Sequence, residues 1–258
     1  MLRFRSLGSG SAGNATVVEA SNGLRTTRLL IDCGLGLRQL DQRLARAGLA
    51  ACDIDAIFVT HEHGDHIGCA HAFALRGRVP VWMSSGTFSA IGSPDFDGLW
   101  HQAADGAGID LGEMCVTPFT VPHDAREPLQ LCCTDGAVRF GVLTDLGHAT
   151  THVLEQLSRC DALLLECNHA PELLAASSYP PFLKRRVGGN YGHLSNASAA
   201  AIARAVCHPG LKAVVAAHLS LQNNRPHLAA EALAQALGWD ADRVGIADAV
   251  YGTDWIGV

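Results

Sequence analysis

The chain has 258 residues, of which 48% are hydrophobic and 17% charged, which is typical of a globular protein and not of a disordered one. Its formal net charge of −6 argues against a protein that coats nucleic acid without sequence preference, because such proteins are usually basic. The nine cysteines include no C-x-x-C pair, which predicts reduced thiols. The chain shows no apolar leader and no run of about 18 apolar residues, so we expect a cytoplasmic protein without a membrane span.

The first half of the chain is predicted to alternate short strands with helices. LRFRSLG and ATVVEA read as strands on either side of a Gly/Ser turn, GSGSAGN, and RLLIDCG reads as a third strand. The spacing of Leu and Ala predicts a helix over residues 37–47 that stops at Gly48. DAIFVT predicts a strand that leads directly into HEHGDH, and a helical segment at 67–76 and a strand, VPVWMS, follow.

The second half is predicted to be strand-rich over residues 113–145 and then to alternate helices and strands. TTHVLEQLSRC reads as a helix and DALLLECN as a buried strand. A helix at 195–207 has Ser195 as its N-cap, and a helix at 225–238 has Pro226 in its first turn and Gly238 at its end. LKAVVAAHLS between them is a strand, and the tail is a final strand or two. With no repeat or linker, the sequence predicts one α/β domain over 1–258, with two sheets packed together and helices outside.

The segment HEHGDH at 61–66 carries the strongest chemical signal. His61 and His63 alternate, so on an extended segment both imidazoles point to one side, and Gly64 permits a tight turn before Asp65 and His66. The segment follows a buried strand, and sites in α/β folds cluster at the carboxyl ends of strands. Because crowded histidines and a carboxylate are costly without a cation, this spacing predicts a metal site.

THEHGDH at 60–66 resembles the T-H-x-H-x-D-H motif of the metallo-β-lactamase superfamily. Four further motifs of that family are matched in chain order, by Asp32 in LLIDCG, His123 in FTVPHD, Asp145 in VLTDLG and His218 in VVAAHLS. The resemblance implies a four-layer αββα sandwich, the metallo-β-lactamase fold, and a hydrolase with one or two bound metal ions.

The resemblance also implies a role for each matched residue. In this arrangement Asp145 bridges two divalent ions. One ion is also held by His61, His63 and His123, and the other by Asp65, His66 and His218. This ligand set suits Zn²⁺, Mn²⁺ or Fe²⁺ without choosing among them. Asp32 is expected to orient the ligand loop, with a turn-capping aspartate as the alternative.

Histidine is abundant, with thirteen residues, and only some are expected at the site. His193, in YGHLSN, resembles the histidine that contacts the scissile phosphate in the phosphodiesterase branches of the family. We therefore predict His193, Asp65 and Asp145 as catalytic residues. His148 and His169 are candidates for lining the same cleft, and the remaining histidines are expected to be surface or packing residues.

Local motifs narrow the expected activity. SLGSGSAGN, TDLGHAT, LECNHA, YPPFLKRRVGGNYGHLSN and AHLSLQNN resemble the YycJ/WalJ-type branch, which resembles metal-dependent nucleases and is described as a DNA 5′→3′ exonuclease. Asn168-His169-Ala170 departs from the NHD expected there, which puts in doubt any role of the missing carboxylate. The interval between Asp145 and His218 is too short for the extra domain of β-CASP nucleases.

A dinuclear phosphodiesterase or nuclease acting on DNA, or on another phosphodiester, is thus the predicted function. The basic run Lys184, Arg185 and Arg186 and the loop residue Asn224 are predicted to bind substrate. A solvated charge run is the alternative for the basic residues, and an ordinary turn is the alternative to anion binding by GSGSAGN. A small-molecule hydrolase for a cyclic phosphate, thioester or lactone is the alternative function, and a non-catalytic metal sensor is a third.

Overall fold

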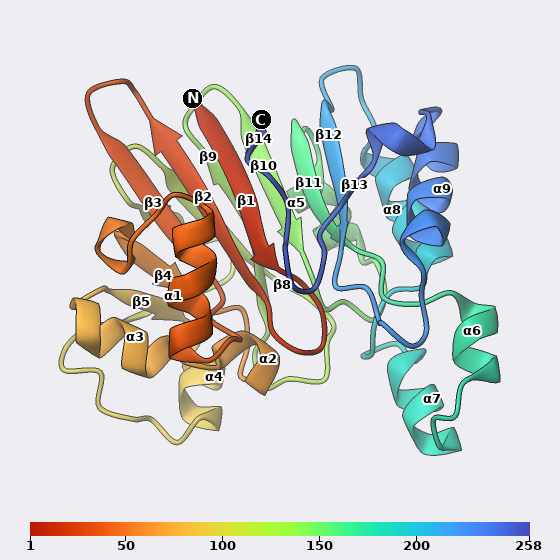
Figure 1. Ribbon diagram of the computed structural model, residues 1–258, viewed down its shortest axis with the longest axis horizontal. Coiled ribbons are helices and arrows are strands. Elements are labelled where there is room, and N and C mark those ends of the chain that lie inside the picture. Colours follow the sequence, from red (N-terminus) through yellow and green to blue (C-terminus); the bar gives the residue numbers. More distant parts are fainter.

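The apolar strand runs assemble into two seven-stranded sheets that pack face to face in the computed structural model, which describes residues 1–258 (Figure 1). The first sheet has the order β14-β1-β2-β3-β4-β5-β6 and is antiparallel up to β3 and parallel beyond it. Its strands are β1 (Leu2–Gly8), β2 (Ala15–Ser21), β3 (Thr26–Ile31), β4 (Ala56–Phe58), β5 (Val81–Met83), β6 (Trp100–Gln102) and β14 (Ile256–Gly257).

The second sheet repeats this plan, with antiparallel pairs up to β10 and parallel pairs from β10 to β13. Its order is β13-β12-β11-β10-β9-β8-β7. The strands are β7 (Ile109–Asp110), β8 (Cys115–Thr120), β9 (Leu129–Thr134), β10 (Arg139–Leu143), β11 (Ala162–Glu166), β12 (Ala213–Ala217) and β13 (Gly245–Ile246).

Helices connect the parallel strands, because parallel neighbours need a crossover. Most of them cover the outer faces of the sheets, whereas α6 and α7 extend away from the second sheet (Figure 1). The first sheet carries α1 (Leu37–Arg46), α2 (Gly64–Ile67), α3 (Ala70–Gly77) and α4 (Ser85–Ala90). The second half contributes α5 (Thr151–Leu157), α6 (Pro171–Ala176), α7 (Pro181–Val187), α8 (Asn196–Val206) and α9 (Pro226–Leu237).

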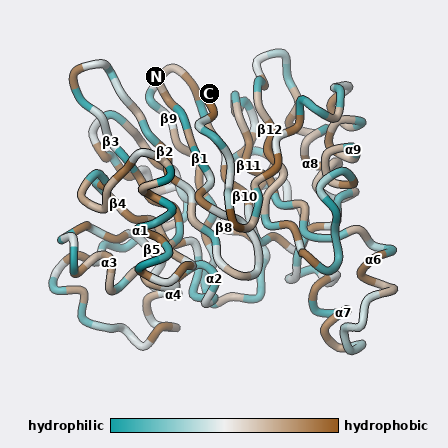
Figure 2. The backbone as a smooth tube through the Cα atoms, in the orientation of Figure 1, coloured by the Kyte–Doolittle hydropathy of each residue, from teal (hydrophilic) through white to brown (hydrophobic).

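Three hydrophobic clusters fill the spaces between these four layers. The central cluster joins the inner faces of the two sheets, where Phe4 of β1 stacks on Phe140 of β10 with ring centroids 4.0 Å apart. The second cluster packs α1 and α3 on the first sheet, and the third packs α5, α8 and α9 on the second. In Figure 2 hydrophobic colouring is concentrated on central strands such as β11 and β12. This is the αββα sandwich expected from the sequence.

The predicted elements differ from the structure in several places, and no element was predicted for the segment that forms α4, β6 and β7. The helix expected at 67–76 is divided into α2 and α3 at Gly68, whose φ of 30° and contact with the Cys33 carbonyl leave no room for a side chain. Helices α6 and α7 are absent from the predicted elements, although Pro171 and Pro181 each stand in the first turn of their helix, where proline is favoured. None of the helices is long and apolar enough to span a membrane.

Candidate metal centre

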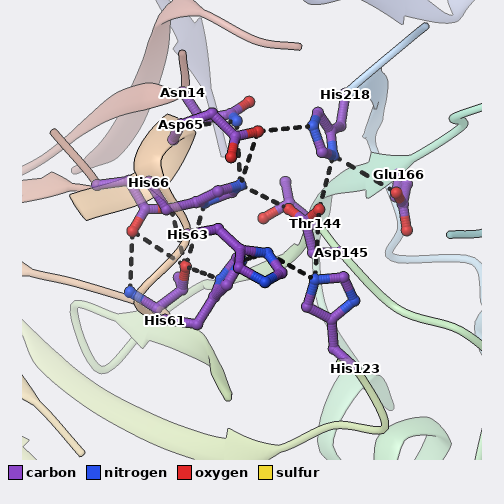
Figure 3. A network of polar contacts seen from close by, with 12 residues as sticks. Asn14, His61, His63, Asp65, His66, His123, Thr144, Asp145, Glu166 and His218 are labelled. Atoms are coloured by element: carbon purple, nitrogen blue, oxygen red, sulfur yellow. Dashed lines mark hydrogen bonds and ion pairs between the residues drawn. The ribbon is translucent and has the colours of Figure 1, made fainter. Parts of the chain in front are cut away.

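The predicted ligands come from strand ends of both sheets and meet at one edge of the sandwich. Asp32 follows β3, residues 60–66 follow β4, Asp145 follows β10 and His218 follows β12. Because these strands run toward the same edge, their carboxyl ends bring the side chains together between the sheets, where they point toward one another (Figure 3).

The backbone at three of these strand ends is left-handed. The φ angles are 59° at Asp32, 60° at Asp145 and 52° at His218, and none of them is glycine. A left-handed conformation costs an ordinary L residue about 1–2 kcal/mol, so each turn is held by its surroundings. The turns redirect the three side chains into the space between the sheets, and such strain is concentrated at functional sites.

Three imidazoles form the first group of possible metal donors. Nε2 of His61 lies 3.0 Å from Nδ1 of His63, and Nε2 of His123 lies 3.3 Å from the same atom. Burial lowers the pKa of His61 and His123, so both rings are neutral at pH 7 and offer lone pairs. Three imidazole nitrogens facing one another match the donor set of one divalent ion.

A second group of donors consists of Asp65, His66 and His218, with Asp145 between the two groups. Asp145 Oδ2 lies 2.8 Å from Nε2 of His66, and Asp145 Oδ1 lies 3.0 Å from Nδ1 of His218. Oδ1 also lies 3.9 Å from Nε2 of His123, in the first group. Asp145 is therefore positioned to contact ions in both groups.

Unpartnered polar atoms in this space support a fit to metal. Asp145 Oδ2 and both ring nitrogens of His218 are buried and form no hydrogen bond of acceptable geometry despite their short contacts. Buried polar atoms without partners are costly and rare in folded proteins. Divalent cations would satisfy them, and the N/O donors present are those that such cations take.

Neighbouring groups set the orientation of the histidine rings. The Asp32 carboxylate accepts hydrogen bonds from Nδ1 of His66 at 2.7 Å and from the Thr60 amide at 2.8 Å. His123 donates from Nδ1 to the Gly192 carbonyl at 3.0 Å. In both rings the Nδ1 proton is engaged, which leaves Nε2 facing the centre.

The carboxylates also change the proton affinity of the buried rings. Burial by itself would lower the pKa of His66, but Asp145 and Asp32 outweigh it and raise that pKa to about 10. Burial likewise opposes the charge on His218, yet Asp145 raises the pKa of His218 well above its usual value. A metal ion that binds these nitrogens therefore displaces protons.

Glu166, at the end of β11, belongs to this site although it is absent from the sequence-predicted residues. It is fully buried, and Oε1 lies 2.7 Å from Nδ1 of His193 and 3.5 Å from Nδ1 of His218. Oε2 accepts hydrogen bonds from the amides of Leu146 and Leu194. The available signal was a glutamate in the apolar run ALLLE, since buried glutamates are rare unless they are paired.

His193 lies at the boundary between this cluster and solvent. Its Nδ1 is 3.2 Å from Asp145 Oδ1, and its side chain is 20% exposed. Burial opposes its charge, but Glu166 and Asp145 raise its pKa to about 9. The Glu166 bond engages Nδ1 and leaves Nε2 available to a molecule that enters from outside.

The turn GSGSAGN holds the ligand loop through Asn14. The Asn14 amide group contacts Nε2 of His66 at 3.1 Å and the Asp65 carbonyl at 3.2 Å, and the Asn14 backbone amide also donates to that carbonyl. Ser9 donates its backbone amide to the Asp248 carbonyl. Only Ser11 and Ala12 at the tip are exposed, so most of this turn holds the centre in place.

The basic residues predicted to bind substrate differ in their distance from the metal centre and in their partners. Arg186 Nε bonds Asp124 Oδ2 at 2.5 Å, and Asp124 Oδ1 lies 3.4 Å from Nε2 of His123, so Arg186 is beside the centre. Arg185 is exposed and forms no ion pair. Lys184 instead donates to the Ala175 carbonyl at the end of α6.

Asn224 is not available to a substrate. Its side chain is buried and exchanges two hydrogen bonds with Asn196 while also donating to the Cys167 carbonyl. The loop after β12 therefore uses this amide to hold itself against α8, which a polar loop sequence does not reveal.

The two further candidate histidines also differ in position. His148 is exposed, and its Nδ1 bonds the Asn190 carbonyl at 2.8 Å. His169 is buried, with Nδ1 unpartnered, and Glu166 and His193 are among the groups that influence its pKa, which burial lowers. Only His169 therefore approaches the Glu166–His193 side of the centre.

Comparison with known proteins agrees with this geometry. The model of the β-lactamase superfamily domain matches residues 27–219. The chain is 32% identical to exodeoxyribonuclease YycJ of Bacillus anthracis, over 98% of this chain and 96% of that one. It is 30% identical to exodeoxyribonuclease WalJ of Streptococcus pneumoniae, over 97% of this chain and 94% of that one.

Among solved structures, the metallo-β-lactamase fold protein YhfI from Bacillus subtilis aligns over the whole of both chains. The TM-score is 0.76 at 16% sequence identity. At this identity the match shows the fold, and the fold is that of the metallo-β-lactamases.

Proposed function

This chain belongs to the β-lactamase superfamily, and we propose on that premise that it is a dinuclear metal-dependent phosphodiesterase that degrades DNA as an exonuclease. The observation that carries the proposal is the buried donor cluster around Asp145, to which four of the five superfamily motifs supply side chains, while the fifth, Asp32, holds the His66 ring. The similarity over nearly the whole chain to proteins named exodeoxyribonucleases supports DNA as the substrate.

Two divalent ions, Zn²⁺, Mn²⁺ or Fe²⁺, fit the two donor groups. His61, His63 and His123 would hold one ion, Asp65, His66 and His218 the other, and Asp145 both. Such a pair supplies positive charge for the phosphoryl oxygens and activates a water molecule for attack on phosphorus.

The protein's own groups are assigned to orientation and proton transfer. Asp65, whose side chain is 24% exposed, reaches both the buried histidines and the solvent, so its carboxylate would accept a hydrogen bond from the attacking water. His193 would donate a proton from Nε2 to the leaving oxygen, with Glu166 holding Nδ1. Leu146 and Leu194 amides keep Glu166 in place, so this pair is oriented before substrate binds.

The direct test is digestion of 5′-labelled and 3′-labelled DNA and RNA by protein that has been stripped of metal and reloaded with Mn²⁺ or Zn²⁺. Stepwise, metal-dependent loss of nucleotides from one DNA end is expected, and His61→Ala should abolish it. His227→Ala is the matched control, because His227 is an exposed histidine of α9 outside the donor cluster.

Bis-p-nitrophenyl phosphate and a thioester are assayed in parallel to separate the enzyme classes. Turnover of a small ester without cleavage of nucleic acid would replace the nuclease with a small-molecule hydrolase. Bound metal without turnover of any substrate would favour a non-catalytic metal-binding protein.

A further inference from the structure

Helices α6 and α7 form an arm beside the centre, residues 170–192, at the lower right of Figure 1. The end of the α6–α7 arm is tied to the proposed ligands through the backbone. The Tyr191 carbonyl accepts from the Asp124 amide at 2.9 Å, and the Gly192 carbonyl accepts from Nδ1 of His123 at 3.0 Å. Whatever binds the arm is therefore brought next to the metal centre.

Two aromatic side chains of the arm are left in solvent. Phe182 of α7 is 65% exposed and Tyr191 is 62% exposed, in a chain with only three tyrosines and eight phenylalanines. Most other rings of the protein are packed in its core or against neighbouring side chains. Large apolar side chains that remain exposed beside a functional site indicate a contact surface.

Positive charge accompanies these rings. Arg186 lies one helical turn after Phe182, so the two side chains share a face of α7, and the Arg186 guanidinium is held by Asp124 beside the centre. The Arg185 side chain is exposed and forms no ion pair; the exposed Arg126 side chain on the adjoining loop also forms none, although the Arg126 backbone amide donates to the Glu62 carboxylate. A protein with a net charge of −6 thus presents cations and rings together on the arm beside the centre.

We propose that the α6–α7 arm is a stacking platform for single-stranded DNA. Phe182 and Tyr191 would stack on unpaired bases, while Arg185 and Arg186 contact phosphates next to the bond that is cleaved. The proposal rests on the proposed nuclease function and names the form of DNA that the site accepts. Bases within a duplex already have both faces covered, so exposed rings select a strand whose bases are unpaired.

The same chemistry explains why rings and arginines occur together. Base–aromatic stacking tolerates any sequence, because every base has a π face, and phosphate contacts follow the backbone without reading it. An exonuclease that proceeds along a strand needs this kind of sequence-independent grip. A buried interface between two copies of the chain would leave the unpaired Arg185 charge to be desolvated, which disfavours that alternative.

The test compares an intact single-stranded oligonucleotide with one of equal length that carries abasic sites near the cleaved end. The quantity measured is the ratio of kcat/KM for the intact to the abasic oligonucleotide. Phe182→Ala and Tyr191→Ala are each expected to reduce this ratio about tenfold, mainly through KM, since stacking contributes on the order of tenfold or more per base. Phe182→Tyr and Tyr191→Phe keep a ring and should restore the wild-type ratio.

Tyr251→Ala is the matched control, because Tyr251 is 73% exposed but its ring packs near Arg46, outside the arm. A wild-type ratio in both alanine variants, with DNA cleavage intact, would overturn the stacking platform alone. If the alanine variants keep the wild-type ratio but differ from the wild type in oligomeric state on sedimentation, the arm is instead a subunit interface. Wild-type protein that hydrolyses bis-p-nitrophenyl phosphate but no oligonucleotide would overturn the nuclease function and the platform together.

Discussion

The Glu166 carboxylate connects the proposed proton donor to the metal ligands. One oxygen is occupied by two backbone amides, and the other bonds Nδ1 of His193. The carboxylate is fully buried, so its charge acts on His193 with little screening by solvent. Glu166 therefore acts through His193 and is a positioning residue.

Removal of this charge should weaken catalysis only while His193 is present. Glu166→Gln is expected to lower kcat on DNA by about 10–100-fold and His193→Ala by about 10²–10⁴-fold. The double variant should be no slower than His193→Ala, because both changes disable the same hydrogen-bonded pair, Glu166 and His193. Steady-state kinetics of the four proteins, with metal content measured in each, would reveal additive effects if the two residues acted independently.

At the level of elements, the turn between β3 and α1 must pass very close to the ligand loop. A Cβ on Gly34 would lie 1.7 Å from the Asp65 carbonyl oxygen, whereas a Cβ on Gly36, two residues later, would meet nothing within 4 Å. The Gly34 amide also donates to the Asn14 carbonyl. The turn therefore sets the position of Asp65 by close backbone packing.

Gly34→Ala is expected to displace the ligand loop, with loss of bound metal and a drop in activity of about 100-fold, because displacements near 1 Å have such effects on catalysis. Gly36→Ala should leave metal content and activity near those of the wild type. Metal analysis and kcat/KM of the two variants provide the measurement. Equal behaviour of the variants would contradict a role for close packing at Gly34.

A buried glutamate joins three neighbouring strands of the first sheet. Glu19 of β2 bonds Arg3 of β1 and Arg28 of β3, each at 2.7 Å, and its side chain is 5% exposed. Burial by itself would raise the pKa of Glu19, but the two arginines outweigh it and lower the pKa below 4.5. The ionised carboxylate therefore stabilises the sheet above that pH, and the contribution is lost as the pH falls through the folded-state pKa.

Glu19→Gln should lower the free energy of unfolding at pH 7 by about 1–2 kcal/mol, less than for a fully buried pair because the arginines are partly exposed. The difference from the wild type should shrink as the pH falls below 4.5. Urea unfolding at several pH values measures it, with the exposed Glu231→Gln as control. A deficit that stays constant down to low pH would rule out a contribution from the carboxylate charge.

For the whole molecule, the metal centre is a junction between two sheets. His61, His63 and His66 follow a strand of the first sheet, whereas Asp145 and His218 follow strands of the second. Ions that bind this set cross-link the layers in addition to the hydrophobic cluster between the sheets. They bind the folded state, since the unfolded chain does not hold the donors together.

Chelation should therefore lower the Tm of the protein. Free metal at a thousandfold excess over Kd stabilises a fold by about 4 kcal/mol, which for a chain of this size corresponds to roughly 10 °C. Calorimetry before and after chelation measures the shift, and added Mn²⁺ or Zn²⁺ should reverse it. The same experiment on His61→Ala should give a smaller shift, and an identical shift would place the stabilising ions elsewhere.

The sequence by itself determined the family and most of the strand and helix pattern, although not helices α4, α6 and α7. Apolar runs such as ALLLE and AVVAA read as buried strands because period and composition are local properties, and HEHGDH predicted a metal site because four donors are close in sequence. Ser195 and Gly238 were correctly predicted as the boundaries of α8 and α9, since capping is also local.

Only the tertiary structure decided which polar residues share the site. Glu166 and Asp124 join the centre through contacts between distant strands and loops, and Asn224 is withdrawn from it by Asn196. Charge and spacing along the chain do not reveal whether a polar side chain is satisfied by protein or left for a ligand, because that depends on partners brought close by the fold. Likewise, phenylalanine is a residue type that is usually buried in a core, and only the position of α7 in the fold leaves the Phe182 ring in solvent.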